Sequence, residues 1–108
     1  MIEEIREARP QLAKLCRRHN VRRLEIFGSA VICKFESRTG DLDFIVEFGP
    51  FAAGGYADRY FALSDDLRQI FGRPVDLLVA RAVRNPYLME SINRTRELLY
   101  EETTASAE

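Results

Sequence analysis

The stretch Asp41-Leu42-Asp43-Phe44-Ile45-Val46-Glu47-Phe48 places two acids, two residues apart, at the start of an apolar run. Aromatic and branched side chains that alternate in this way are typical of a β-strand. Residues i and i+2 of a strand point to the same face, so Asp41 and Asp43 are expected to project together. The alternate residues should point the other way, into a core: Leu42, Phe44, Val46 and Phe48.

Paired carboxylates of this kind favour a cation site. Two carboxylates held side by side repel each other, and one tends to stay protonated unless a cation offsets the charge. Mg²⁺ is commonly bound by one or two carboxylates together with substrate phosphates. A pair of metal ions can then clamp the attacking and leaving oxygens of a phosphoryl displacement. We therefore predict that Asp41 and Asp43 are catalytic residues and metal ligands.

A third acid, Asp76, lies in a second strand-like run, residues 73–80. If this run forms a neighbouring strand, Asp76 should face the same cleft as Asp43. There it would complete the metal site or accept the proton of an incoming hydroxyl. Asp76 is therefore our third candidate catalytic residue and metal ligand.

Gly28 and Ser29 follow another strand-like run, residues 22–27, and precede a short helix expected within residues 30–36. A glycine lets the backbone approach a ligand closely. A serine at a helix start offers its hydroxyl and the free N–H groups of the first turn to an anion. We predict that Gly28 and Ser29 bind a nucleotide triphosphate beside the metal-binding carboxylates.

Each of these features alone has an ordinary explanation. A Gly-Ser pair is a common turn, an Asp-x-Asp at a strand start is often a solvated edge, and Asp76 alone would be a surface acid. Their occurrence in this order, on three consecutive strand-like segments, favours a functional site.

The segments Phe27-Gly28-Ser29, Asp41-Leu42-Asp43 and Val75-Asp76-Leu77 together resemble the minimal nucleotidyltransferases of the DNA polymerase beta-like superfamily. The resemblance runs from about Val21 to Tyr100 and includes Leu98-Leu99-Tyr100 near its end. It implies an α/β fold in which a small mixed sheet is flanked by helices.

The same resemblance implies a function. Such proteins act as antitoxins whose partner is a HEPN-domain toxin, bound in a hetero-oligomer. With Mg²⁺ as cofactor and ATP as substrate, the antitoxin transfers AMP to a hydroxyl of the toxin, with tyrosine as the expected acceptor. Another possible function is transfer to a small molecule such as an aminoglycoside. Transferases of that kind usually have more substrate-binding structure than this length allows.

The turn departs from the family pattern, in which Gly-Ser is followed by x-Ala-Arg-Gly. Here Ile32 stands in place of the arginine and Cys33 in place of the glycine, and Gly40 replaces the serine that precedes the paired acids. Losing a guanidinium near a triphosphate removes a strong anion partner. We therefore expect weak catalysis, and the alternative function is neutralisation of the partner by binding alone.

The composition fits one small domain, expected over residues 1–102 with a frayed tail at 103–108. Sixteen basic and seventeen acidic residues give a net charge of −1, which argues against a nucleic-acid binder. The chain shows no membrane-spanning apolar stretch and no signal-peptide pattern, so a cytoplasmic protein is expected. Cys16 and Cys33 lack metal-type spacing and are expected to be buried thiols.

Helical spacing predicts three further segments. An N-terminal helix should be divided by Pro10, a second helix should span residues 56–71 and end at Gly72, and a third should follow Pro86. The stretch 98–100 either extends the last helix or forms a short closing strand. His19 is expected at a helix end, and the candidates for a partner surface lie on one segment: Tyr56, Tyr60 and Phe61.

Overall fold

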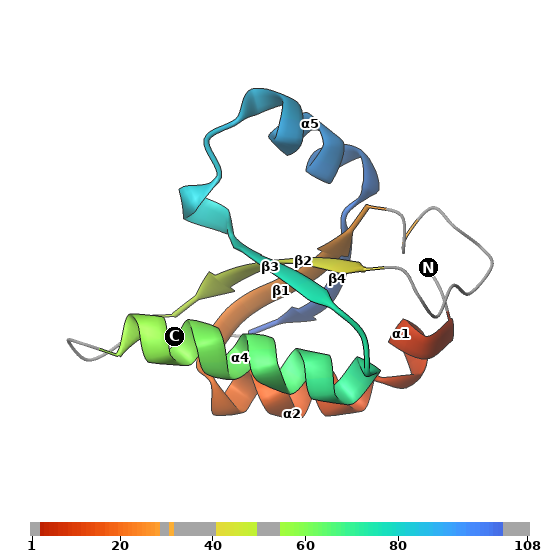
Figure 1. Cartoon of the computed structure of the whole chain (residues 1–108), viewed down its shortest axis with the longest axis vertical. Coiled ribbons are helices and arrows are strands. Elements are labelled where there is room, and N and C mark those ends of the chain that lie inside the picture. Colours follow the sequence, from red (N-terminus) through yellow and green to blue (C-terminus); the bar gives the residue numbers. More distant parts are fainter. Residues whose placement is uncertain (1–2, 29–30, 32–40, 50–54, 103–108) are drawn as a thin grey trace.

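A four-stranded mixed sheet lies at the centre of the computed structural model, which describes residues 3–28, 31, 41–49 and 55–102 (Figure 1). The strand order is β3-β2-β1-β4. β1 pairs antiparallel with both β2 and β4, whereas β2 and β3 are parallel, which confirms the predicted mixed sheet. The strands are β1 (Val21–Phe27), β2 (Leu42–Phe48), β3 (Val75–Val79) and β4 (Glu97–Glu101).

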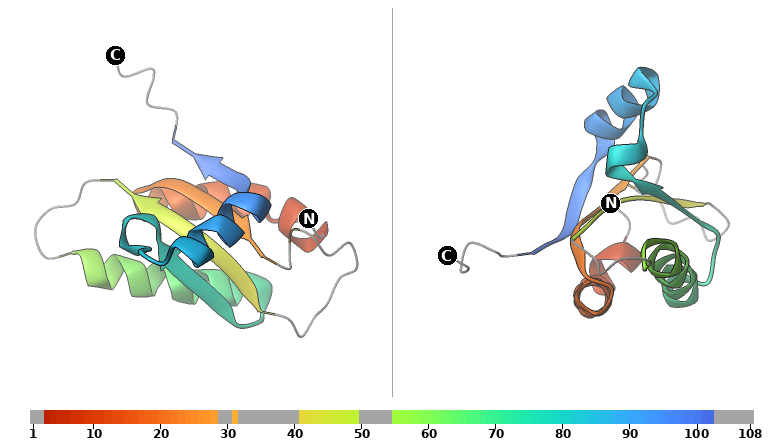
Figure 2. Two further views of the ribbon diagram at one scale, coloured as in Figure 1. Left: turned by 90° about the horizontal axis from the view of Figure 1, so that it is seen from above. Right: turned by 90° about the vertical axis from the view of Figure 1, so that its left-hand side faces the viewer.

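Helices cover both faces of this sheet (Figure 2). One face carries α1 (Glu3–Glu7), α2 (Arg9–Arg18) and α4 (Tyr56–Phe71), and the other carries α5 (Pro86–Thr95). A single 3-10 turn, η1 (Ala80–Ala82), leads from β3 towards α5.

The middle of the central strand β2, from Phe44 to Val46, is buried on both faces. Leu42, Phe44 and Val46 enter the main core beneath α2 and α4, as the alternation predicted, and Phe48 packs at its edge. Phe44 stacks on Phe71 of α4 with 5.9 Å between ring centroids. On the opposite face, Ile45 forms a second cluster with Phe27 and with Ile92 of α5. A strand enclosed in this way is held firmly in position, because its side chains pack against helices above and below.

The helix ends follow local rules that the sequence shows. Pro10 lies in the first turn of α2, and α1 ends three residues earlier at Glu7. Gly72 closes α4 in the left-handed region at φ 64°, which a glycine adopts without strain. Pro86 begins α5, and the side chain of Asn85 accepts hydrogen bonds from the Tyr87 and Leu88 N–H groups at 2.9 and 3.3 Å.

Leu98, Cys16 and His19 lie where the sequence predicts them. The closing strand is confirmed, since Leu98 belongs to β4 rather than to the preceding helix. Cys16 is fully buried, and burial raises the pKa of its thiol to about 12. His19 caps α2, and its Nε2 is 2.8 Å from the Asp66 carboxylate of α4.

Other expectations concern residues outside the described ranges, among them the helix within residues 30–36 and the tail 103–108. Ser29, Ile32, Cys33 and Gly40 also lie outside them. None of the described helices is both long enough and apolar enough to cross a membrane.

Candidate functional site

The candidate residues in or next to β1, β2 and β3 meet where the end of β1 lies beside the starts of the other two strands. Because β1 is antiparallel to β2 and β2 is parallel to β3, the end of β1 lies beside the starts of β2 and β3. Phe27 pairs with Asp43, and Asp43 pairs with Asp76. The structure therefore brings two of the three predicted acids directly opposite each other and places Gly28, the residue after Phe27, next to them.

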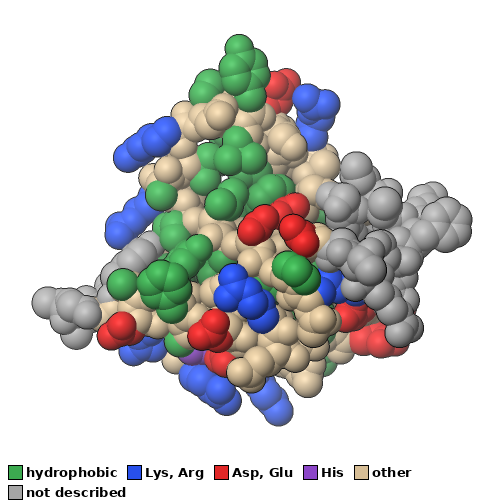
Figure 3. Space-filling model, in the orientation of Figure 1, with side chains coloured by type: hydrophobic (Ala, Val, Ile, Leu, Met, Phe, Trp, Pro, Cys, Tyr) green, Lys and Arg blue, Asp and Glu red, His purple; other side chains and the backbone are tan. Residues whose placement is uncertain are grey.

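These two acids point to the face that α5 covers. The residues on either side of each acid are buried in the core beneath α2 and α4, so by the two-residue period of a strand the acids face the other way. In Figure 3, acidic side chains gather near the centre of the visible face, beside hydrophobic side chains that continue up to α5. Asp43 is partly buried, and Asp76 is exposed.

The environment raises the pKa of Asp43 to about 6. Burial is the largest cause, because it disfavours the charged carboxylate. The negative charge of Asp76, a hydrogen bond between the two side chains, and the charge of Asp41 raise it further. The pair is thus a concentration of negative charge that favours holding a proton or a cation.

Gly28 brings the main chain against this pair. Its φ is 83°, and a Cβ built there would lie 2.9 Å from Oδ2 of Asp43, so a larger residue would be both strained and too close. Its N–H donates to Oγ1 of Thr95, at the end of α5, over 2.9 Å. Thr95 was not a candidate from the sequence, because no motif or spacing links it to a turn 67 residues away.

The predicted metal ligands are only partly assembled. Within residues 3–28, 31, 41–49 and 55–102, no group of three or more His, Cys, Asp or Glu side chains is arranged to hold a metal ion. Asp41 is exposed just before β2, and its charge acts on Asp43 without completing such a group. The Asp43–Asp76 pair still suits Mg²⁺, which commonly takes one or two carboxylates and fills its other positions with substrate phosphates and water.

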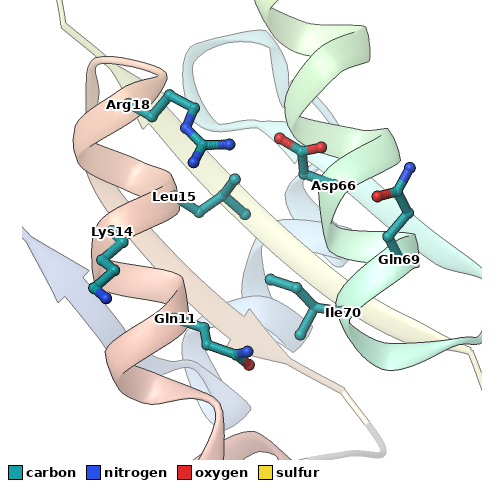
Figure 4. Close-up of a pocket in the computed structure, with 7 residues that line it drawn as sticks. All are labelled: Gln11, Lys14, Leu15, Arg18, Asp66, Gln69 and Ile70. Carbon is teal, nitrogen blue, oxygen red and sulfur yellow. The ribbon is translucent and has the colours of Figure 1, made fainter.

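A groove of about 570 Å³ lies elsewhere, between α2 and α4 (Figure 4). Lys14 and Arg18 of α2 line it together with Asp66 and Gln69 of α4. These helices cover the face of the sheet opposite to Asp43, so the groove is not part of the carboxylate site.

Comparison with known proteins links this arrangement to a family. Residues 5–99 match the family described as "Nucleotidyltransferase domain". The curated "Putative protein adenylyltransferase MJ0128" of Methanocaldococcus jannaschii is 31% identical over 100 residues, which are 92% of this chain and 96% of that protein.

Solved structures agree with the fold. A structure described as a putative minimal nucleotidyltransferase is 28% identical, with a TM-score of 0.68, and the match covers 88% of this chain and 92% of that one. A chain from the complex of a tri-AMPylated Shewanella oneidensis HEPN toxin with its MNT antitoxin has a TM-score of 0.62 over 95% of this chain and 77% of its own length. Its identity is 16%, so this second likeness concerns the fold alone.

The raised pKa of Asp43 predicts that Asp43→Asn stabilises the metal-free protein at pH 8. The pKa in the folded state, about 6, lies above the ordinary 3.8, so charging Asp43 opposes folding, and this penalty develops as the pH rises from about 4 to 6. Because the side chain is only partly buried, solvent screening reduces the gain to about 1 kcal/mol. Urea unfolding with a chelator at pH 4 and pH 8 measures it, and the two proteins should differ least at pH 4.

Asp76→Asn is the matched variant, because it removes the neighbouring charge while leaving Asp43 in place. It should also stabilise the protein at pH 8, by a smaller amount, since burial is the larger cause of the shift. If Asp43→Asn is no more stable than the parent at pH 8, the pair is not under electrostatic strain.

Proposed function

Because the chain belongs to the family of nucleotidyltransferase domains, we propose that it transfers AMP from ATP to a hydroxyl of a partner protein with the help of Mg²⁺. The observation that carries the proposal is the pairing of Asp43 with Asp76 beside Gly28. The relative named as a protein adenylyltransferase supports AMP as the transferred group and a protein as the acceptor.

In this proposal the paired carboxylates of Asp43 and Asp76 would hold Mg²⁺, and Asp41, just before β2, would be the third ligand. The raised pKa of Asp43 is the physical argument, because burial and the neighbouring acids together disfavour a bare carboxylate, so a divalent cation is favoured once the proton leaves. When bound, the cation polarises the phosphate oxygens and offsets the charge that develops on them.

Three residues of the chain, Asp76, Gly28 and Ser29, then act on the substrates. The hydroxyl oxygen of the acceptor attacks the α-phosphorus of ATP, the bond to pyrophosphate breaks, and the hydroxyl proton passes to Asp76. Asp76 suits this role because it is exposed to an incoming partner. Gly28 has no side chain to block the phosphates, so the main chain of the turn can approach them, and Ser29 is proposed to add its hydroxyl.

The proposed partner is a HEPN-domain toxin, and the proposed acceptor is one of its tyrosines. The support comes from the fold-level likeness to an MNT antitoxin in complex with an AMPylated HEPN toxin. Exposed aromatic residues suit a protein partner, and Phe61 on α4 and Tyr87 on α5 are 63% and 81% exposed. Tyr60 is less available, because its hydroxyl donates to the Leu77 carbonyl at 2.6 Å.

Neutralisation of the toxin by contact alone is the second candidate function. The observation that favours it is the replacement of the family's Arg-Gly by Ile32-Cys33, which leaves the turn without its guanidinium. The two functions differ in one measurable respect: only the first consumes ATP.

The first prediction is that MgATP binds to the parent and raises its melting temperature, whereas ATP with a chelator does not. A ligand at 100 times its Kd stabilises a protein by about 2.7 kcal/mol. Mg²⁺ competes with the proton on Asp43, so binding should be tighter at pH 8 than at pH 5.5. Calorimetric titration at both pH values measures this.

Asp43→Asn should lose the magnesium-dependent part of the binding. The control is Asp65→Asn, because Asp65 is an exposed acid on α4 that pairs with Arg68 over 3.4 Å. This variant should bind MgATP as the parent does. Unchanged binding by Asp43→Asn would show that the metal site has been assigned to the wrong residue.

A further prediction concerns the partner. Co-expressed with a HEPN-domain protein encoded beside it, the chain should co-elute with that protein in size-exclusion chromatography at micromolar concentration. With ATP and Mg²⁺, mass spectrometry should find AMP on a tyrosine of the partner. Phe61→Ser and Tyr87→Ser, tested separately, should identify which exposed aromatic residue lies in the interface. Separate elution of the two proteins would argue against the partnership.

The replacement of the family's Arg-Gly by Ile32-Cys33 predicts that AMP transfer is slow and that restoring the two residues makes it faster. A guanidinium that reaches a phosphate contributes about 1.5–3 kcal/mol, so the double variant Ile32→Arg and Cys33→Gly should raise the single-turnover rate of AMP transfer by roughly 10- to 100-fold. An equal or lower rate in a folded variant would refute this explanation. A parent that transfers no AMP to any partner tested would instead favour the binding-only function.

A further inference from the structure

The last turn of α5 holds the turn that contains Gly28. We infer that Thr95 is a positioning residue for nucleotide binding, because its hydroxyl fixes the Gly28 N–H and thereby sets where the main chain stands against Asp43. This inference rests on the proposed function for its effect on ATP. Its structural part, the hold on Gly28, can be tested without any nucleotide.

The Thr95 hydroxyl is oriented by two hydrogen bonds. It donates to the Ser91 carbonyl one turn earlier in α5, over 3.0 Å, and it accepts from the Gly28 N–H over 2.9 Å. Threonine in a helix often bonds to the carbonyl four residues before it in this way. Because the hydroxyl proton is engaged by Ser91, the oxygen lone pairs are left to receive the Gly28 N–H.

The hydrogen bond to Thr95 restricts a residue, Gly28, whose backbone is otherwise free to adopt several conformations. The β1–β2 pairing ends at Phe27 and Asp43, so Gly28 lies just beyond the last ladder pair. A glycine has more backbone freedom than other residues, and its left-handed φ of 83° is one conformation among several that it can adopt. The bond to Thr95 restricts it to the conformation that lies against Oδ2 of Asp43.

Arg96, the residue after Thr95, anchors the end of α5 and so helps to place Thr95 beside Gly28. The Arg96 guanidinium donates to the Glu25 carboxylate of β1, with Nη2 at 2.7 Å from Oε1 and Nε at 3.2 Å from both oxygens. Glu25 is 4% exposed, which favours a strong, charge-assisted contact. Ile92, one turn before Arg96, is fully buried against Phe27. Apolar and charged contacts thus join the end of α5 to Phe27 and Glu25 of β1, and the Thr95 hydroxyl joins it to Gly28, just after β1.

Two substitutions separate the hydroxyl from the size of the side chain. Thr95→Val keeps the branched shape and removes the hydroxyl, whereas Thr95→Ser keeps the hydroxyl and removes the methyl group. Ser91→Ala is the matched control on the same helix, because only the main-chain carbonyl of Ser91 takes part in the bond. Unfolding midpoints establish that each variant is folded.

Hydrogen exchange of the Gly28 amide, followed by NMR without nucleotide, is the first measurement. The calorimetric Kd for MgATP is the second. In Thr95→Val we expect exchange at Gly28 to be faster by about 3- to 10-fold and the Kd to rise by a similar factor, as the loss of one hydrogen bond predicts. Thr95→Ser and Ser91→Ala should resemble the parent in both measurements.

The outcomes separate the two proposals. If the parent itself binds no MgATP, the proposed function fails, and exchange at Gly28 still decides whether Thr95 holds the turn. If the parent binds MgATP but Thr95→Val leaves both exchange and Kd unchanged, the inference about Thr95 is wrong. Equal losses in Thr95→Val and Thr95→Ser would also overturn it, because the hydroxyl would then not be the cause.

Discussion

The candidate site is built around one unfavourable contact that the fold imposes, the placement of the Asp43 and Asp76 carboxylates opposite each other on parallel strands. Burial and the neighbouring acids raise the pKa of Asp43 to about 6, so the charged site is strained in the absence of a cation. Strain of this kind often accompanies function, because the arrangement that destabilises the free protein favours the ligand that relieves it. The parallel register maintains the pairing, since sliding β3 by one residue would turn Asp76 to the opposite face.

The rest of the fold holds this contact in place. β2 is enclosed on one face by the core beneath α2 and α4, where Phe44 is fully buried, and on the other by the cluster around Ile92 of α5. The end of α5 adds polar contacts, from Thr95 to the Gly28 turn and from Arg96 to Glu25. The helix that covers the acidic face therefore also supports the turn beside it.

The local sequence predicted much of this arrangement. The alternation in residues 41–48 identified β2 and its core face, because the two-residue period of a strand is visible in the order of side chains. Pro10, Gly72 and Pro86 located helix boundaries, since each acts on its own backbone. The resemblance to minimal nucleotidyltransferases supplied the mixed sheet, which local patterns alone leave undetermined.

By itself, then, the sequence determined the four strands, the helices around Pro10, Gly72 and Pro86, and the presence of Asp43 and Asp76 on strands that could be neighbours. Only the tertiary structure decided that these two acids pair directly, that Asp41 joins no three-ligand group among the residues it describes, and that Thr95 accepts a hydrogen bond from the Gly28 N–H. The physical reason is that periodicity and backbone preference act over a few residues, whereas these contacts join segments that are tens of residues apart. Their geometry depends on strand register and on where α5 packs, which no local pattern encodes.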